Sequence, residues 1–457
     1  MYTDTIAAIA TSMSNSGIGI VRISGSESFA VIDRIFKGNK EKKLSQCQSH
    51  TIHYGYICDD EHVIDEVIVL LMCGPRSYTG EDTVEIDCHG GSFVVKRILE
   101  TVINYGCRPA EPGEFTKRAF LNGRIDLSQA EAVGDLISAQ NEYALKNSVS
   151  QLKGSIKNKI NEIRNKIIYE TAFIESALDD PEHISIDGYG QELKLKMIDF
   201  IEQLDQLIST ADNGRILKEG INTVIIGKPN AGKSSLLNVL AGKDRAIVTE
   251  VAGTTRDILE EHIQLHGLTL NVIDTAGIHD AQDVVEKIGV SKAKEYADRA
   301  DLIIYVVDGT KPLDDNDHQI IQMIANKKVI ILINKSDMNR RISKEEIIKF
   351  INKPIIDISA KEETGINELE DMLKHMFFQG EISFNEEIYI TNIRQKTALN
   401  DARNSLIKVN ESIDGGLPED FYSIDLMDAY HNLGLITGET IGEDLADEIF
   451  SKFCMGK

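Results

Sequence analysis

The sequence predicts a multidomain protein: an α+β amino-terminal domain, an all-α helical domain, and an α/β P-loop domain with a mixed sheet inserted into the helical domain. Short β-branched segments dominate up to about residue 120, and apolar residues at helical spacing dominate from Leu127. The helical spacing stops near residue 219 and resumes after 380, as an insertion would require, since domain termini often lie close together. The expected domain boundaries are 1–120, 121–218, 219–380 and 381–457.

Composition sets further bounds. A chain of 457 residues with 42% hydrophobic content is long enough for about three ordinary domains. The formal net charge of −24 argues against a general nucleic-acid coat, because phosphate neutralisation dominates that kind of binding; a local basic patch remains compatible with it. No Lys or Arg precedes Arg22 and no apolar run reaches membrane length, so neither a signal peptide nor a membrane span is expected. The six cysteines lack a Cys-x-x-Cys pair and are expected to be reduced thiols in a cytoplasmic protein.

The amino-terminal domain is expected to hold three strands and a helix, at 18–23, 66–71, 83–87 and 90–105. Its candidate functional residues are Arg22, Glu85 and Arg124. Taken singly, each is more typical of a solvated side chain or a surface ion pair. His89 follows the third strand, where a structural turn histidine is favoured over a metal ligand or a base.

The helical part carries a start signal, apolar stripes and a basic stretch. Ser128 and Glu131 have the spacing of a capping box. Three stripes are expected to form the core of a bundle: Ile156, Ile160, Ile163 and Ile167; Met197, Ile201, Leu204 and Ile208; and Leu399, Ala402, Leu406, Val409 and Ile413. The stretch 146–166 holds six basic residues against Glu162 alone. It is either a solvated helix face or a surface for RNA phosphates.

The most specific motif is Gly-Lys-Pro-Asn-Ala-Gly-Lys-Ser at 227–234, which fits Gly-x-x-x-x-Gly-Lys-Ser/Thr. A β-branched strand pattern precedes it and a helix pattern follows it. This arrangement aims backbone N–H groups and the positive end of a helix dipole at phosphate oxygens. Lys233 would reach the terminal phosphates, and the Ser234 hydroxyl would bind Mg²⁺. The alternative is an ordinary strand–turn–helix corner, and the motifs that follow argue against it.

Three later motifs, each at the exit of an expected strand, identify the nucleotide. Asp274 begins Asp-Thr-Ala-Gly and is placed to hold the Mg²⁺ shell. Asp337 ends Asn-Lys-Ser-Asp, and its carboxylate can accept both N–H groups on one edge of guanine, where adenine has no matching pair of donors. Ser-Ala-Lys at 359–361 would support the base with main-chain N–H groups. Motifs in this order resemble the translation-factor class of GTPases and predict GTP.

The residues expected to bind GTP come from these motifs and the loop between the first two: Asn230, Ala231, Gly232, Lys233, Ser234, Ser235, Thr249, Thr255, Asp274, Thr275, Ala276, Gly277, Asn334, Lys335, Asp337, Ser359, Ala360 and Lys361. The segment 263–273 is expected to be a hairpin, with parallel strands at 302–307, 329–333 and 355–358.

Several residues are candidates for a role in hydrolysis. Small signalling GTPases place a water-orienting Gln after Asp-x-x-Gly, but Ile278 occupies that position here. The nearest downstream carboxylates are Asp280, Asp283 and Glu286. Arg256 is a candidate arginine finger, although an Arg in such a loop is more often a surface residue, and Thr255 is the natural second hydroxyl ligand of Mg²⁺.

The chain ends Phe-Cys-x-Gly-Lys, and Cys454 is fourth from the end. The middle positions and the final Lys do not suit a prenylation signal. The position of Cys454 in the sequence is compatible with a nucleophile or with a small buried apolar residue. It favours the buried residue.

Taken together, these motifs resemble the tRNA modification GTPase family MnmE, also called TrmE, over essentially the whole chain. The specific marks are Gly-Ile-Val-Arg-Ile-Ser-Gly at 19–25, Tyr-Thr-Gly-Glu-Asp at 78–82, Pro-Gly-Glu-Phe at 112–115, the inserted GTPase and the terminal Phe-Cys-x-Gly-Lys. The family adds an aminomethyl-type group to C5 of the wobble uridine, position 34, of certain tRNAs, together with a flavin-dependent protein of the GidA/MnmG family.

The resemblance implies further roles. The amino-terminal domain is expected to form a homodimer and to bind 5-formyltetrahydrofolate or a related tetrahydrofolate; the matching positions are Arg22, Glu85, Arg124 and Lys457. Family members can carry Lys at the position of Arg124. The resemblance therefore implies a positive charge at this position rather than a particular side-chain geometry. A potassium ion beside the phosphates is expected on Asn230, Thr249, Val251 and Thr254, with Mg²⁺ on Ser234 and Thr255. Glu286 matches the water-orienting acid and Cys454 a cysteine implicated in modification, so these two are the candidate catalytic residues.

The family resemblance also implies binding partners, and two alternative functions are compatible with the sequence. The resemblance implies a heterotetramer with the MnmG/GidA-family protein, a tRNA substrate and no membrane. Two other readings remain: a switch protein such as a ribosome-assembly GTPase with docking flanks, and an ATPase in which Asn-Lys-x-Asp has no role.

Overall fold

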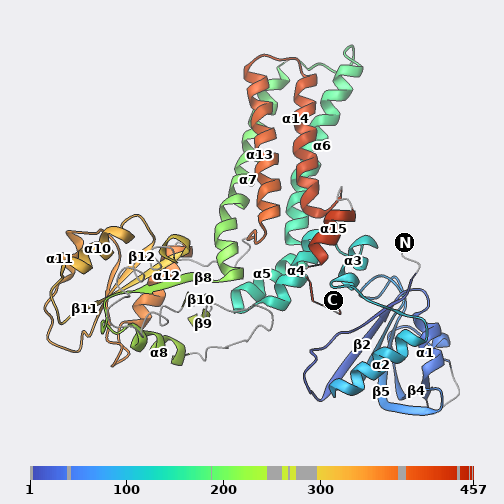
Figure 1. Ribbon diagram of the computed structural model, residues 1–457. Helices are drawn as coiled ribbons and strands as arrows, with labels where there is room; N and C mark the ends of the chain where they lie inside the picture. Colours follow the sequence, from blue (N-terminus) through green and yellow to red (C-terminus); the bar gives the residue numbers. More distant parts are fainter. Residues whose placement is uncertain are drawn as a thin grey trace. The chain divides into compact units, whose positions relative to one another are not determined.

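The structure is a computed structural model, which describes residues 4–38, 43–186, 188–243, 260–265, 268–273, 296–378, 388–439, 443–451, 453, 454 and 456. It divides into two compact units (Figure 1). The first comprises residues 1–137, 149–201 and 398–457, and the second comprises 138–148 and 202–397. The expected multidomain class, with an α+β part, a helical part and an α/β part, is confirmed.

The first unit contains a seven-stranded sheet in the order β3-β4-β5-β6-β2-β1-β7. Its strands are β1 (Ile6–Ile9), β2 (Ile18–Ser24), β3 (Phe36–Gly38), β4 (Thr51–Asp59), β5 (His62–Met72), β6 (Thr83–His89) and β7 (Arg108–Pro109). All pairs are antiparallel except β1 with β7. Two helices, α1 (Ser28–Ile35) and α2 (Ser92–Asn104), pack their buried residues on one face of this sheet (Figure 1). The three strands and the helix expected here are confirmed.

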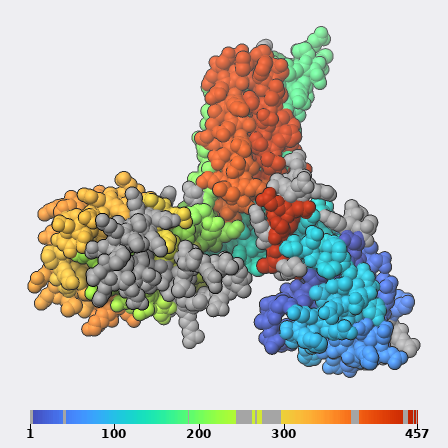
Figure 2. All heavy atoms as spheres, in the orientation of Figure 1, coloured from blue at the N-terminus to red at the C-terminus, as the bar shows by residue number. Residues whose placement is uncertain are grey.

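Helices make up the rest of this unit, and several of them continue into the second. They are α3 (Glu114–Leu121), α4 (Leu127–Ser138), α5 (Glu142–Leu152), α6 (Ser155–Asp179), α7 (Tyr189–Glu219), α13 (Ile393–Asp414), α14 (Asp420–Thr437) and α15 (Glu443–Phe450). The stripes of α6 and α13 are fully buried as expected, whereas on α7 Ile201 and Ile208 are only half-buried beside buried Met197 and Leu204. In Figure 2, α13 and α14 form one continuous surface of the bundle.

The capping box lies two residues before the expected one. The Asp126 side chain accepts a hydrogen bond from the backbone N–H of Gln129 (2.9 Å), and the Gln129 side chain accepts one from the N–H of Asp126 (3.1 Å). Ser128 instead lies inside the first turn and donates to Asp126 (2.6 Å). Asp is as good an N-cap as Ser, so the capping rule allowed either residue and the chain uses the earlier one.

The basic stretch 146–166 is largely neutralised by neighbouring acids. Ion pairs join Lys146 to Glu142, Lys157 to Asp126, and both Lys159 and Lys166 to Glu162. Arg164 is buried, pairs with Glu439 (2.6 Å for Nη2) and lies over the Tyr430 ring. These contacts favour a helix face over a surface for RNA phosphates.

The second unit is built on a six-stranded mixed sheet in the order β13-β12-β11-β8-β10-β9. Its elements are β8 (Ile221–Ile226), α8 (Lys233–Lys243), β9 (Glu260–Leu265), β10 (Leu268–Ile273), β11 (Leu302–Asp308), α10 (Asp315–Ile324), β12 (Val329–Asn334), α11 (Lys344–Ile348), β13 (Ile355–Asp357) and α12 (Ile366–Phe378). Only β9 is antiparallel to its neighbour, so the expected pairing of 263–273 and the parallel strands are confirmed.

Strand β8 lies between β10 and β11, its parallel neighbours. The chain leaves β8 first toward β10 and later crosses to β11. Its carboxyl end is therefore a topological switch point, where open α/β sheets bind ligands. Among the described residues, no helix is long and apolar enough to cross a membrane.

Candidate functional site

The loop after β8 has a backbone that few residues other than glycine can adopt. Gly227 and Gly232 have φ of 152° and 100°, and Asn230 has φ of 65°. A Cβ at Gly227 would overlap the carbonyl oxygen of Val306, and one at Gly232 would overlap the Asn334 amide. The loop therefore fits closely against neighbouring strands and leaves a concave backbone in front of α8, which begins at Lys233. This confirms the expected strand–loop–helix context of the motif.

Lys233 is held by the loop that it follows. Its Nζ donates hydrogen bonds to the carbonyl oxygens of Gly227 (2.8 Å) and Lys228 (3.0 Å). Burial removes water from the ammonium group and thereby lowers its pKa. Among the described residues, no anion offsets this effect. A phosphate placed in the concave loop would supply that anion. The next two residues, Ser234 and Ser235, are exposed at the start of α8, so the Ser234 hydroxyl can serve as the oxygen ligand that Mg²⁺ prefers.

Asn334 connects three of the motifs. It is 2% exposed at the end of β12, and its amide Nδ2 donates to the carbonyl oxygen of Ala231 (2.9 Å). Its Oδ1 accepts from the backbone N–H groups of Lys335 (2.8 Å) and Ala360 (3.1 Å). The phosphate loop, Asn-Lys-Ser-Asp and Ser-Ala-Lys are thus brought together by one buried side chain.

The residues expected to bind the base lie beside this junction. Ser359 donates to Asp337 Oδ1 (2.6 Å), and this hydrogen bond lowers the pKa of the Asp337 carboxyl. Lys335 has φ of 66° and its ammonium contacts Asp308 Oδ2 (2.7 Å). Lys361 is exposed. The geometry therefore presents an exposed carboxylate near Lys335, as guanine recognition requires.

Sequence reasoning did not identify two residues that shape this site. Asp308 ends β11 and fixes Lys335, and its place directly after a buried strand was the available signal. Lys228 contacts Asp314 (2.8 Å) and Asp317 (2.6 Å) at the start of α10, where Tyr305 also donates to Asp317 (2.8 Å). These contacts fasten the phosphate loop to α10, which spacing alone does not reveal.

Many of the expected site residues lie outside the described residues, and the structure adds nothing about them. They are Thr249, Val251, Thr254, Thr255, Asp274, Thr275, Ala276, Gly277, Glu286 and Lys457, together with Arg256, Ile278, Asp280 and Asp283.

A second cluster forms in the first unit, where β2 and β6 pair Arg22 directly opposite Glu85. Arg22 Nε donates to Glu85 Oε1 (2.7 Å), and the two side chains are only 13% and 18% exposed. The guanidinium also lies over the rings of Tyr78 (5.2 Å) and Phe115 (5.6 Å). Arg124 lies over Tyr78 as well (5.1 Å). Tyr78 thus connects the two arginines, and Arg22 and Glu85 form a shielded pair rather than separate solvated side chains.

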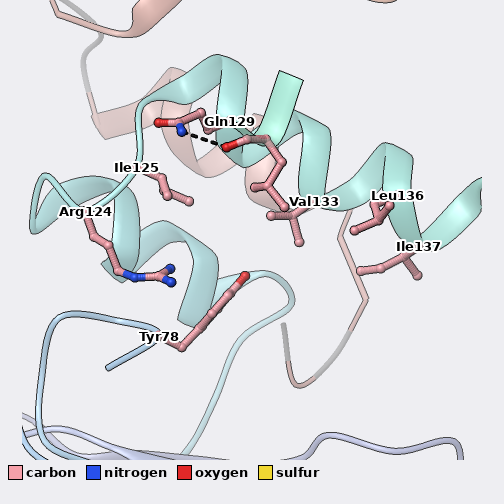
Figure 3. A pocket seen from close by; sticks show the side chains of 8 residues that line it. Tyr78, Arg124, Ile125, Gln129, Val133, Leu136 and Ile137 are labelled. Carbon is pink, nitrogen blue, oxygen red and sulfur yellow. Dashed lines mark hydrogen bonds between the residues drawn. The ribbon is translucent and has the colours of Figure 1, made fainter. Parts of the chain in front are cut away.

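A cavity of about 430 Å³ adjoins this cluster (Figure 3). Figure 3 shows Arg124 and Tyr78 side by side at one end, opposite Val133 and Leu136. The remaining lining residues are Ile125, Gln129, Ile137 and Leu152. A largely apolar pocket with a cation and an aromatic ring at one end suits a flat organic ligand with an anionic group.

The carboxy-terminal tail lies against the same cluster. The N–H of Gly113 donates to the carbonyl oxygen of Cys454 (3.3 Å), and Arg22 Nη1 donates to that of Gly456 (3.3 Å). Cys454 is exposed, so the expectation of a small buried residue is wrong: the tail is anchored through Phe453, Gly456 and its backbone, and the thiol remains accessible. His89 pairs with Asp65 (2.7 Å) and is itself exposed, in line with a structural turn residue.

A buried ion cluster supports this region and was not anticipated. Arg118 is fully buried and donates to Glu114 Oε1 (3.0 Å), Asp4 Oδ1 (2.9 Å) and Glu81 Oε2 (3.2 Å). Arg108 donates to Glu114 Oε1 (2.6 Å). Burial by itself would raise the pKa of Glu114, but the hydrogen bonds from Arg108, Arg118 and a backbone N–H hold that pKa below its usual value. The cluster connects α3 to the loop that carries Tyr78.

Comparison with known proteins covers the whole chain. The family model for the MnmE helical domain matches residues 127–454, and the model described as GTP-binding protein TrmE N-terminus matches residues 5–124. Similar proteins named tRNA modification GTPase MnmE include one from Lachnoclostridium phytofermentans, 59% identical over 100% of both chains. Others are from Acetivibrio thermocellus, 50% identical over 99% of both, and Clostridioides difficile, 47% identical over 99% of both.

Proposed function

The chain belongs to the MnmE family of tRNA modification GTPases and is a GTP-hydrolysing enzyme, and from this premise we propose that it is a potassium-dependent GTPase that modifies C5 of the wobble uridine of certain tRNAs. It does so with a flavin-dependent MnmG/GidA-family protein and a tetrahydrofolate one-carbon unit. The observation that carries the GTPase part is Asn334, which joins the phosphate loop to both base-binding motifs.

For the nucleotide, the described residues act as follows. The concave loop at 227–232 and Lys233 bind the β- and γ-phosphates, and the Asp337 carboxylate accepts the two guanine N–H groups. Asn334 holds these parts in register, and Ser359, Ala360 and Lys361 border the base. Mg²⁺ would be bound by Ser234 together with Thr255 and would neutralise charge on the transferred phosphoryl group.

For hydrolysis, we assign the potassium ion to Asn230, Thr249, Val251 and Thr254. Asn230 supports this assignment, because its φ of 65° places it on the exposed turn of the phosphate loop. The ion would supply the positive charge that an arginine finger supplies elsewhere. Glu286 would orient the attacking water. Replacing potassium by sodium should lower turnover sharply; indifference to the cation would favour Arg256 instead.

For the one-carbon unit, we assign Arg22, Glu85, Arg124 and Lys457 to 5-formyltetrahydrofolate or a related tetrahydrofolate. The support is the shared Tyr78 ring, the shielded Arg22–Glu85 pair and the adjoining cavity. Cys454, exposed beside this cluster, is the candidate catalytic residue of the modification. Calorimetric titration of the full chain with 5-formyltetrahydrofolate tests the assignment, and the absence of heat would contradict it.

For assembly, we propose a homodimer through the amino-terminal sheet and a heterotetramer with the flavin-dependent partner. The face opposite α1 and α2 leaves apolar side chains exposed, with Ile52 68%, Tyr54 56% and Ile68 41% accessible. Tyr54 and Ile68 are directly opposite on β4 and β5, so they form one surface. We further propose the four-segment domain division at 120, 218 and 380, and a cytoplasmic location.

The alternative is a regulatory or ribosome-assembly GTPase with flanking docking domains. Such a protein has no use for a folate, so the same titration separates the two functions. Wobble-nucleoside analysis of tRNA from cells lacking this chain tests the modification directly: normal modification at position 34 would refute it.

A further inference from the structure

Gly456, the glycine of the terminal Phe-Cys-x-Gly-Lys, lies in close contact with the backbone of Ile9 and Ala10. We propose that Gly456 is a positioning residue: its backbone approaches β1 as only a glycine can, and this contact holds Cys454 near the Arg22–Glu85 pair. This inference rests on the proposed modification reaction, since that reaction gives Cys454 its role.

The first argument is the backbone of Gly456 itself. Its φ is 82°, in the left-handed region, and the residue is buried. A Cβ there would overlap the carbonyl oxygen of Ile9 and lie 2.9 Å from the Cα of Ala10. Both are backbone atoms of a segment that runs along the sheet at β1, so they cannot move aside as a flexible side chain would. A residue with a side chain therefore cannot occupy this position in the docked tail.

The second argument is what the Gly456 carbonyl contacts. It accepts a hydrogen bond from Arg22 Nη1 (3.3 Å), while Arg22 Nε is engaged by Glu85 (2.7 Å). The rings of Tyr78 and Phe115 further restrict the guanidinium. Because Arg22 is fixed by its strand partner and by two rings, it offers the tail a defined anchor rather than a mobile surface charge.

A separate anchor lies on the amino-terminal side of Cys454. The N–H of Gly113 donates to the Cys454 carbonyl oxygen (3.3 Å), and Gly113 has φ of 69° with no room for a Cβ beside Phe450. Phe453 packs on Phe450 with ring centroids 5.4 Å apart. The backbone is thus held on both sides of Cys454, while Cys454 itself is exposed.

The chain provides a matched control for replacing Gly456. Gly416 has φ of 62° in the turn between α13 and α14, and a Cβ there would meet nothing within 4 Å. Gly416→Ala therefore introduces the same kind of backbone strain without an overlap and away from the tail. Comparison of Gly456→Ala with Gly416→Ala isolates the close approach to β1.

The experiment uses the purified full chain. Carboxypeptidase Y digestion followed by intact-mass spectrometry measures how fast the terminal residues are removed, and removal reports the undocked population. We expect Gly456→Ala to be trimmed at least about tenfold faster than wild type, and Gly416→Ala to match wild type. In cells, wobble-nucleoside analysis should show modification by Gly456→Ala falling to the level of a deletion of residues 454–457.

Each result decides the proposal. Faster trimming with loss of modification supports it. Trimming at the wild-type rate would show that the tail tolerates a side chain at 456 and would overturn the backbone argument. Faster trimming with normal modification would overturn the positioning role. Titration of wild type with 5-formyltetrahydrofolate is scored separately, because failure to bind would refute the folate assignment and leave the trimming result unaffected.

Discussion

Replacement of Asn334 tests whether one buried amide integrates the nucleotide site. Asn334→Ala removes three hydrogen bonds, those with the Ala231 carbonyl and with the N–H groups of Lys335 and Ala360. Ala231 and Ala360 are themselves only 1% and 6% exposed, so water cannot readily replace the lost partners. Each buried group left unpaired costs about 1–3 kcal/mol, and partial rehydration at Lys335 brings the total to roughly 3 kcal/mol.

That loss is divided between the fold and nucleotide binding. If all of it fell on the bound state, roughly 3 kcal/mol would weaken GDP affinity by on the order of 150-fold. Titration with a fluorescent GDP analogue measures the affinity, and amide hydrogen exchange of peptides spanning 334–337 and 359–361 measures the local opening. We expect both to change.

Asn334→Asp is the matched variant. Its carboxylate keeps the two accepted hydrogen bonds but loses the donor to Ala231 and sets a negative charge against that carbonyl. We therefore expect near-normal exchange protection at Ala360 with a large loss of nucleotide affinity. If Asn334→Ala changed neither affinity nor exchange by more than about 0.5 kcal/mol, the claim that this side chain unites the motifs would be refuted.

Three further predictions follow from the sites. Asp337→Asn should reduce GTP affinity by roughly 100-fold and favour xanthosine triphosphate, because an amide cannot accept both guanine N–H groups. Competition binding with the two nucleotides measures this change in preference. Unchanged GTP binding would overturn the base assignment. Glu286→Ala should retain GTP affinity but slow single-turnover hydrolysis, since a water-positioning residue acts mainly in the transition state; equal losses in both would indicate a structural role instead. Glu114→Gln should destabilise the amino-terminal domain by about 2 kcal/mol at neutral pH, because it removes the buried carboxylate shared by Arg108 and Arg118 and leaves them only Asp4 and Glu81 as counter-charges. The folded-state pKa of Glu114 is lowered, so its contribution is present above the ordinary value of 4.5 and disappears as pH falls through the folded pKa. Denaturant midpoints should therefore depend less on pH below about 5 in the variant than in wild type, and parallel pH curves would contradict this.

Features that depend on a few neighbouring residues could be predicted from the sequence. The phosphate loop, the strand before it and the helix after it are encoded locally, because glycine φ values and β-branched or helical spacing act over short segments. The paired strands of the amino-terminal domain and the buried stripes of α6 and α13 followed from the same periodicities. Resemblance over the full chain then identified the family, which the comparisons confirm.

Contacts between residues far apart in the chain could not be predicted in this way. Asn334 reaches Ala231 from 103 residues away, and Arg22 reaches Gly456 from 434 residues away. The burial of Arg164 within a basic stretch, where it pairs with Glu439, also depends on residues far away in the chain. Hydrogen bonds and ion pairs between side chains depend on where those side chains lie in three dimensions. The hydrophobic periodicity of a segment and its helix or strand propensity carry no information about that placement. The motifs could therefore be predicted from the sequence, whereas the contacts that join them into a site could not.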